Sequence, residues 1–218
     1  MALRAVDAVV LVLGASSGIR SELVRVWSRV TALGLPCLLF LNELDKDGIS
    51  SDEVVALCQR DLGIMPLPMS LPFGKGAQLE GVMDLLQQSL ITSRTETPTF
   101  QQLPIPENER ALVADAWKRV QEGVAEHDDR LLEQYLAVGE LTLEDLTNGL
   151  RLGVQAGTIV PLYSGSAIKN IGIVPLLNAI VGLLPSPMDR AAKTPLEGLR
   201  PDTGEAVSRR AVHEDPFS

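Results

Sequence analysis

The chain has 218 residues, of which 45% are hydrophobic and 22% charged, so it can bury a sizeable core and is not mainly disordered. Its formal net charge of −9 argues against a broad nucleic-acid-binding surface and predicts no direct contact with DNA. The longest apolar stretches are too short or too interrupted to cross a bilayer, and no basic, cleavable leader precedes the first. This predicts a cytoplasmic protein that does not contact a membrane.

The N-terminal part of the sequence has the pattern of an α/β fold. Residues 5–13 form a nearly continuous apolar run that ends at Gly14, which predicts a central strand buried on both faces. An amphipathic helix is expected over residues 21–33 and a second buried strand over residues 37–41. A strand, a helix and a strand at this spacing indicate one βαβ unit of a parallel sheet. The capping box of Ser50 and Glu53 predicts a further helix, which Gly63 can end.

The pattern changes from residue 64 to about residue 157, where prolines punctuate short strands and residues 93–106 are polar. Within this segment, residues 107–124 carry a helical apolar stripe, and Thr142 and Gly157 mark the start and end of another helix. The α/β pattern resumes with a buried strand at residues 158–163 and an apolar helix at residues 173–184. We therefore expect an α/β fold with a doubly wound, mostly parallel sheet and an inserted α+β subdomain.

The glycine-rich turn at residues 14–18 leaves a second interpretation open, because it is similar to the dinucleotide loop of short-chain dehydrogenases. Arg20 stands where that fingerprint has its third glycine, and neither Tyr135 nor Tyr163 begins a Y-x-x-x-K motif. The phosphate-binding sequence G-x-x-x-x-G-K-[ST] does not occur in the chain. With two histidines in all, no multi-histidine metal site is expected, and no catalytic residue can be assigned.

Two loops carry a pattern that we interpret as a base-recognition site. Asn42-Glu43-Leu44-Asp45 follows the strand at residues 37–41, and residues 164–170 follow the strand at residues 158–163. Both loops lie beyond the carboxyl ends of strands, where open α/β sheets bind ligands. An aspartate there can accept hydrogen bonds from the N1–H and 2-amino groups of guanine, and a backbone N–H can donate to O6.

With these two loops the sequence resembles the translational GTPases, and most of all elongation factor G and its paralogues. Residues 41–45 are similar to the N-K-x-D motif of that family, and residues 165–172 are similar to its second guanine loop. The resemblance implies that Asn42, Asp45, Ser166 and Ala167 bind the guanine base of GTP or GDP. The similarity extends to residues 2–12, 68–74, 79–85, 126–136, 184–187 and 213–218.

The resemblance also implies a domain organisation. Residues 1–62 and 159–190 would be part of a P-loop GTPase domain, interrupted at residues 63–158 by the insertion of elongation factor G, and residues 191–218 would be a linker to a β-barrel domain. The complete factor would act on the ribosome, and the insertion is a candidate contact for the ribosomal stalk. Two alternatives stay open: a non-catalytic module that binds the ribosome or its stalk, and an NAD(P)-dependent short-chain reductase.

The sequence departs from the family pattern in two ways. The P-loop and both switches, which hold the phosphates and Mg²⁺ and position the attacking water, would precede Met1. We therefore expect weak binding of GTP and GDP, binding of Mg²⁺ only if the half of the domain with the P-loop and switches is supplied, and no hydrolysis by the chain alone.

Glu43 replaces the motif's lysine, and its carboxylate is expected to repel phosphate and to create a buried-charge conflict. The strand at residues 6–13 would be an edge strand that invites self-association.

Overall fold

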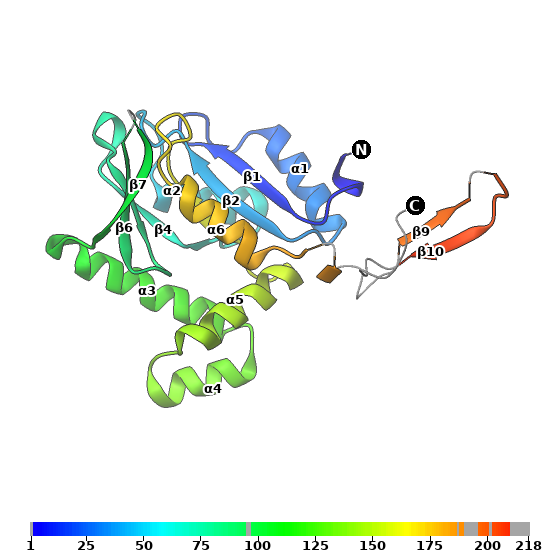
Figure 1. The fold of residues 1–218 in the computed structure, drawn as a ribbon. Helices are drawn as coiled ribbons and strands as arrows, with labels where there is room; N and C mark the ends of the chain where they lie inside the picture. Colours follow the sequence, from blue (N-terminus) through cyan, green and yellow to red (C-terminus); the bar gives the residue numbers. More distant parts are fainter. Residues whose placement is uncertain (1, 95–96, 187, 190–195, 201, 210–218) are drawn as a thin grey trace.

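The computed structural model of the chain describes residues 2–94, 97–186, 188–189, 196–200 and 202–209. Its first sheet contains parallel strands in the order β1-β2-β8-β3 (Figure 1). These strands are β1 (Val9–Gly14), β2 (Cys37–Asn42), β8 (Pro161–Ser164) and β3 (Leu67–Pro68). The predicted α/β fold with a parallel sheet is therefore confirmed. In the ranges that the structure describes, no helix combines the length and apolar character needed to span a membrane.

Helices cover both faces of this sheet, and the side chains of β2 show it most clearly. Leu39 and Leu41 pack into one apolar cluster with residues of α1 and α2, whereas Leu38 packs into another cluster that includes α6. Successive side chains of a strand point to opposite faces, so a strand covered on both faces is apolar at every position. The three helices are α1 (Ser21–Ala32), α2 (Ser51–Leu62) and α6 (Ile173–Leu183).

The first strand is shorter and less buried than the sequence predicts. β1 begins at Val9 rather than at residue 5, and of its residues only Leu11 and Leu13 are buried, so the expectation of a strand buried on both faces is wrong. The physical reason is its position: among the described strands β1 lies at the edge of the parallel sheet, as expected. Its Val12 side chain is consequently 54% exposed.

Residues 70–104 form a second, antiparallel sheet in the order β4-β5-β6-β7. Its last strand, β7, lies in the segment that the sequence shows only as polar, and it forms because its backbone pairs with β6. The strands are β4 (Ser70–Phe73), β5 (Gly81–Asp84), β6 (Ser89–Arg94) and β7 (Thr97–Pro104). The helices that follow are α3 (Arg110–Ala125), α4 (Asp129–Val138) and α5 (Leu143–Ala156), and short 3-10 turns occupy Ala2–Arg4, Gly76–Gln78 and Glu107–Glu109.

The helix boundaries follow the predicted caps. At the start of α2, the Glu53 N–H donates to Ser50 Oγ at 3.3 Å, and the Ser50 N–H donates to Glu53 Oε2 at 2.7 Å. At the start of α5, Thr142 Oγ1 accepts a hydrogen bond from the Asp145 N–H at 3.1 Å. Gly63 and Gly157 end these two helices with φ of 70° and 74°, the left-handed conformation that glycine adopts without strain.

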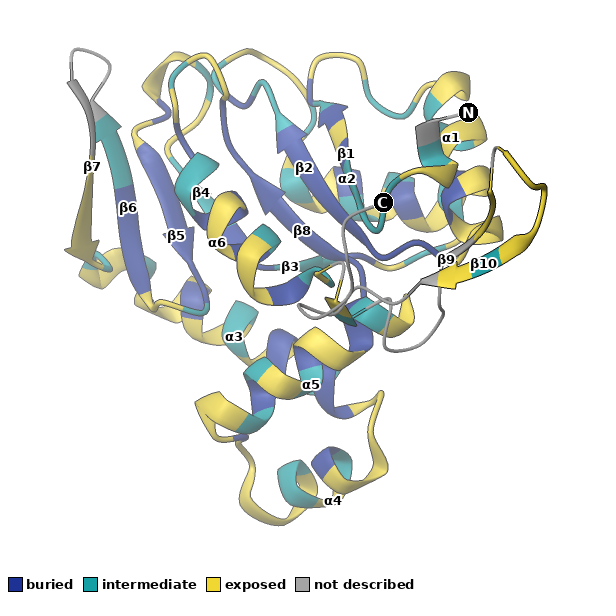
Figure 2. Ribbon diagram, turned by 45° about the vertical axis from the view of Figure 1, so that its right-hand side comes forward, coloured by how far each residue is buried: buried dark blue, intermediate teal, exposed yellow. Residues whose placement is uncertain are grey.

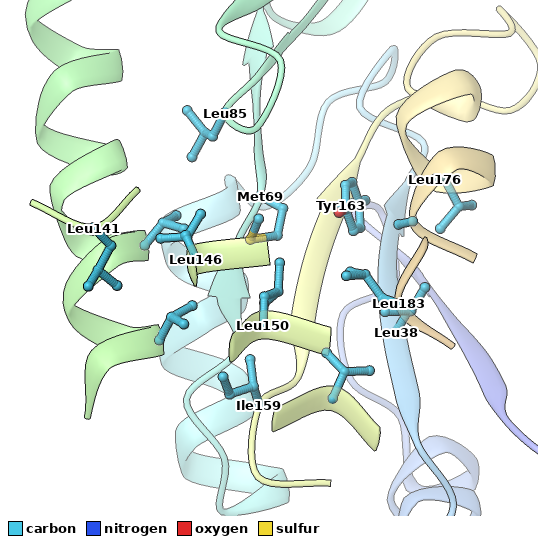
Figure 3. Packing of buried hydrophobic residues seen from close by; sticks show 14 of the residues in the cluster. Leu38, Met69, Leu85, Leu141, Leu146, Leu150, Ile159, Tyr163, Leu176 and Leu183 are labelled. Carbon is cyan, nitrogen blue, oxygen red and sulfur yellow. The ribbon is translucent and has the colours of Figure 1, made fainter. Parts of the chain in front are cut away.

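The inserted segment shares its core with the parallel sheet. Leu146 and Leu150 of α5 belong to the same buried cluster as Leu38 of β2 and Tyr163 of β8 (Figure 3). The two-residue strand β3 lies within residues 63–158, yet it pairs with β8 in the parallel sheet. Insertion and sheet are therefore packed as one body, and α4 lies at the end of the insertion that is far from the parallel sheet (Figure 2).

The segment after residue 190 differs from the expected linker in its described part. β9 (Leu196–Leu199) and β10 (Ala206–Arg209) pair as an antiparallel hairpin. Gly204, with φ of 68°, lies in the connecting turn, and its N–H donates to the Arg200 carbonyl at 2.8 Å. Such a turn needs a residue that accepts positive φ, which explains the hairpin. Residues 213–218, which resemble the opening of a β-barrel domain, lie outside the described residues.

Asp84 is a buried carboxylate at the end of β5, with 4% of its surface exposed. Its Oδ1 accepts hydrogen bonds from the N–H groups of Leu86 at 2.9 Å and Gln87 at 3.0 Å. Burial raises the pKa of the carboxyl group, against the opposing effect of these two N–H donors. Asp84 therefore satisfies two backbone donors at the cost of burying a charge.

We expect Asp84→Ala to lower the free energy of unfolding by about 2–4 kcal/mol, because it leaves two N–H groups without their acceptor. Asp84→Asn, the matched control, keeps an acceptor oxygen and should cost less than about 1 kcal/mol. Folding raises the pKa of the Asp84 carboxyl group above the ordinary value that it has in the unfolded chain. The wild type should therefore lose stability relative to Asp84→Asn as the pH rises from that ordinary value through the raised value of the folded state. Urea unfolding at several pH values measures both effects, and equal stabilities of the Ala and Asn variants would contradict this role.

Candidate functional site

The structure brings the two predicted loops together at the carboxyl end of the parallel sheet. β2 and β8 are neighbours with Leu41 opposite Ser164, so the loops that follow them leave the sheet side by side (Figure 1). The Gly165 N–H donates to the Leu41 carbonyl at 2.9 Å, and the Leu44 N–H donates to the Gly165 carbonyl at 3.2 Å. We call residues 42–45 the first base loop and residues 165–170 the second base loop.

Asn42 joins the two base loops through its side chain. Its Oδ1 accepts a hydrogen bond from the Ala167 N–H at 2.9 Å, while its backbone carbonyl accepts from the Ala15 N–H at 2.9 Å. The Ala167 N–H, which the sequence assigns to the base, is thus bonded inside the protein. Asn42 positions this donor at the mouth of the site, and a base that uses it must share it with Asn42 or displace the Asn42 oxygen.

Asp45, on the first base loop, has an acceptor atom that no donor of the described residues uses. The Asp45 Oδ1 atom is buried and has no hydrogen-bond partner among the described residues. A buried carboxylate oxygen without a donor is costly, so a ligand that supplies N–H groups at this point would be bound favourably. The N1–H and 2-amino groups of guanine are donors of this kind, and the residues present therefore fit a guanine base.

Ser166 and two glycines shape the second base loop. Ser166 is fully buried, it exchanges backbone hydrogen bonds with Ile171 at 3.0 and 2.9 Å, and its Oγ accepts from the Lys169 N–H at 3.3 Å. Gly165 and Gly172 pass each other so closely that an added Cβ at Gly165 would lie 2.1 Å from the Ile171 carbonyl oxygen. Ser166 therefore holds the loop in shape, and Ala167 is left exposed at its tip.

Glu43 lies above the turn that follows β1. Its Oε1 forms an ion pair with Lys46 Nζ at 2.8 Å, and its Oε2 accepts a hydrogen bond from Ser16 Oγ. Lys46 and Ser16 together lower the pKa of the Glu43 carboxyl group, and Glu43 raises the pKa of Lys46. The side chain is 30% exposed, so the expected buried-charge conflict is wrong: Lys46 compensates the charge, and water reaches it.

The turn at residues 14–18 does not fit a dinucleotide. The Ser17 and Gly18 N–H groups, which would have to point at a pyrophosphate, donate to the Gly14 carbonyl at 3.1 and 2.9 Å. The Glu43 carboxylate also approaches this turn, since an added Cβ at Gly14 would lie 3.1 Å from Glu43 Oε2. Occupied donors and a nearby negative charge both disfavour phosphate, so the reductase interpretation has no cofactor cradle at this turn.

A third segment contacts both base loops and was missed by the sequence reasoning. The Gly76 N–H donates to the Leu44 carbonyl at 3.1 Å, and Lys169 Nζ donates to the Ala77 carbonyl at 3.0 Å. The only sequence signal was Gly74-Lys75-Gly76, which fails as a phosphate-binding motif. Two glycines around a lysine do indicate a tight turn, but nothing in the sequence says what that turn contacts.

Two further features of the described residues bear on ligands. No group of three or more His, Cys, Asp or Glu side chains in the described part of the chain is arranged to hold a metal ion.

A cleft of about 820 Å³ lies between α2 and α3, beside the amino ends of β3 and β8, with Gln59, Met65, Arg119 and His127 in its walls. None of the predicted site residues lines this cleft, because they lie at the carboxyl ends of the strands.

The chain matches a protein family and several solved structures. A family model described as the elongation factor Tu GTP binding domain matches residues 1–186. Among solved structures, the chain is similar to the protein ttk003000868 from Thermus thermophilus, with a TM-score of 0.79 and 29% sequence identity. The match covers 95% of this chain and 32% of that chain, so the chain spans about a third of the length of the protein it matches.

Proposed function

Because the chain belongs to the family of elongation factor Tu GTP-binding domains, which bind guanine nucleotides in translation, we propose that it is the guanine-recognition half, with its insertion, of an elongation factor G-like translation factor. The observation that carries the proposal is Asp45 Oδ1 on the first base loop, a buried acceptor that has no donor among the described residues, while Ala167 is exposed on the second base loop. Asp45 would accept hydrogen bonds from guanine N1–H and the 2-amino group, and the Ala167 N–H would donate to O6 in place of its bond to Asn42.

The proposed domain division follows the same resemblance. Residues 1–62 and 159–190 would be the GTPase part, residues 63–158 the insertion, and residues 191–218 the connection to a β-barrel domain. The parallel pairing of β3 with β8 and the shared core indicate that the insertion is anchored firmly at its first strand. A partner that pulls on the insertion would therefore act on the sheet directly.

We propose that the insertion contacts the ribosome, with its stalk as the candidate partner. The supporting observation is on α4 and the start of α5, where Leu136, Val138 and Leu143 are 77%, 69% and 59% exposed. Exposed apolar side chains that gather on one projecting element are typical of interaction surfaces. The same surface is what a non-catalytic stalk-binding module would use, so that alternative shares this observation. A translation factor of this kind would act in the cytoplasm.

The edge of the parallel sheet is a second proposed contact surface. β1 is an edge strand among the described strands, and Val12 is exposed on it; an open edge of this kind pairs readily with other chains. We expect the isolated chain to self-associate, with an apparent mass in light scattering that rises with concentration. A constant monomer mass up to high concentration would contradict this expectation.

We expect the chain to be inactive in GTP hydrolysis, with or without ribosomes. The sequence holds no G-x-x-x-x-G-K-[ST] motif, and without it the γ-phosphate and Mg²⁺ are not positioned, which is most of the catalysis in phosphoryl transfer. Mg²⁺ would bind together with the phosphates if the other half of the domain were supplied. The measurement is single-turnover hydrolysis with protein in excess of labelled GTP, with purified ribosomes in a parallel reaction. Phosphate release above the ribosome background that Asp45→Ala abolishes would restore an enzymatic role.

A further inference from the structure

We propose that residues 74–79 of the insertion, which we call the clamp loop, hold the two base loops in their binding arrangement, and that Lys169 is the residue that closes this clamp. The inference rests on the proposed function, since it concerns the same guanine site. It assigns part of the guanine affinity to the insertion, and it makes Lys169 a positioning residue that does not itself touch the base.

The contacts form a closed circuit of hydrogen bonds. The Leu44 N–H of the first base loop donates to Gly165 of the second, and the Leu44 carbonyl accepts from the Gly76 N–H of the clamp loop. One residue further along the clamp loop, the Ala77 carbonyl accepts from Lys169 Nζ at 3.0 Å. Lys169 belongs to the second base loop, as Gly165 does, so these bonds close the circuit. Opening any one of these bonds leaves the two base loops joined by fewer constraints.

Each of the three segments is also anchored in the core, the second base loop through Ile171, which directly follows it. Leu44, Leu79 and Ile171 are buried in one apolar cluster, with 9%, 4% and 3% of their surface exposed. The clamp loop is itself a tight turn, because an added Cβ at Gly74, where φ is +89°, would lie 2.0 Å from the Gln78 carbonyl oxygen. Lys169 thus bonds to a carbonyl whose position the fold determines.

The consequence for the guanine site follows from preorganisation. Asp45 and Ala167 lie on different loops, so both reach one base only while the loops keep their relative position, and a binding site that is ordered in advance spends less of its interaction energy on ordering. Lys169 Nζ points away to Ala77 and is not one of the groups that the proposal places on the base. Its removal should therefore weaken guanine binding without changing base preference.

The experiment compares three variants of the whole chain, labelled with ¹⁵N and titrated with GDP and ADP at millimolar concentration. Lys169→Met removes the donor and keeps most of the apolar stem, Lys169→Arg keeps a donor, and Lys118→Met is the matched control because Lys118 is an exposed lysine on α3. A second readout without nucleotide is the amide exchange rate of Ala167, whose N–H is bonded across the loops to Asn42. Thermal unfolding checks that each variant folds.

We expect Lys169→Met to weaken GDP binding about threefold to tenfold, the effect of one lost hydrogen bond, and to accelerate exchange at Ala167. Lys169→Arg and Lys118→Met should both behave like the wild type, and the preference for GDP over ADP should be unchanged in all three. Unchanged GDP affinity and unchanged exchange in Lys169→Met would overturn the clamp. If exchange at Ala167 is faster in Lys169→Met but the wild type does not distinguish GDP from ADP, the guanine assignment and the inferred effect on guanine affinity would both be overturned. The contact between Lys169 and Ala77 would then still hold the loops together.

Discussion

Replacing Gly172 with alanine is expected to lower the free energy of unfolding by about 2–4 kcal/mol, a large effect for a single methyl group. Gly172 has φ of +78°, and an added Cβ would lie 2.2 Å from the Ser164 carbonyl oxygen. The end of a flexible side chain can rotate away from such a contact, but a backbone carbonyl cannot. The backbone must therefore shift where β8 passes into the second base loop. Loss of stability should therefore accompany loss of order at Ala167.

The control for this variant is Gly182→Ala on α6, where an added Cβ meets nothing within 4 Å. Alanine is the better helix former, so this variant should be as stable as the wild type or more stable by up to about 1 kcal/mol. Urea unfolding followed by tryptophan fluorescence compares the two. Equal stabilities of Gly172→Ala and Gly182→Ala would show that the crossing of Gly165 and Gly172 is not as tight as the structure has it.

The second large effect is expected from Asp45→Asn, which should exchange the preference for guanine for a preference for xanthine. Xanthine has a carbonyl at C2 where guanine has an amino group, so the asparagine amide can donate where the Asp45 carboxylate can only accept. Two charge-assisted hydrogen bonds are affected, and the ratio of the affinities for GDP and xanthosine diphosphate should change by about a hundredfold.

Competition titrations with the two nucleotides measure this ratio. Asp47→Asn is the control, because Asp47 is an exposed aspartate two residues further along the chain and the proposal gives it no contact with the base. A ratio that stays the same in Asp45→Asn, or changes equally in Asp47→Asn, would remove Asp45 from the site.

The parts of the fold that could be predicted from sequence are those where local chemistry and tertiary environment agree. β2 is apolar from Cys37 to Leu41 because both of its faces are covered, and Ser50 with Glu53 forms the capping box that its spacing indicates. The proximity of the two base loops could also be predicted from the sequence. Two polar loops that follow parallel strands lie at one edge of the sheet whenever those strands are neighbours, and β2 and β8 are neighbours.

The features that the sequence could not reveal depend on contacts between distant segments. Val12 is as apolar as the residues of β2, and only the edge position of β1 exposes it. The charge of Glu43 suggested a conflict because the sequence does not show that Lys46 and Ser16 both reach its carboxylate. The bond from Lys169 to Ala77 joins residues 92 positions apart, and no local pattern encodes it.

The central claim is that the base loops recognise guanine, and the most direct test is titration of the ¹⁵N-labelled wild-type chain with GDP and with ADP. We expect GDP to shift the amide signals of Asp45 and Ala167 while ADP leaves them in place, with a GDP dissociation constant weaker than about 1 µM, which corresponds to roughly −8 kcal/mol. Weak binding is expected because the phosphates have no cradle in this sequence. Equal responses to the two nucleotides, or shifts that leave both base loops unaffected, would contradict the guanine-recognition account.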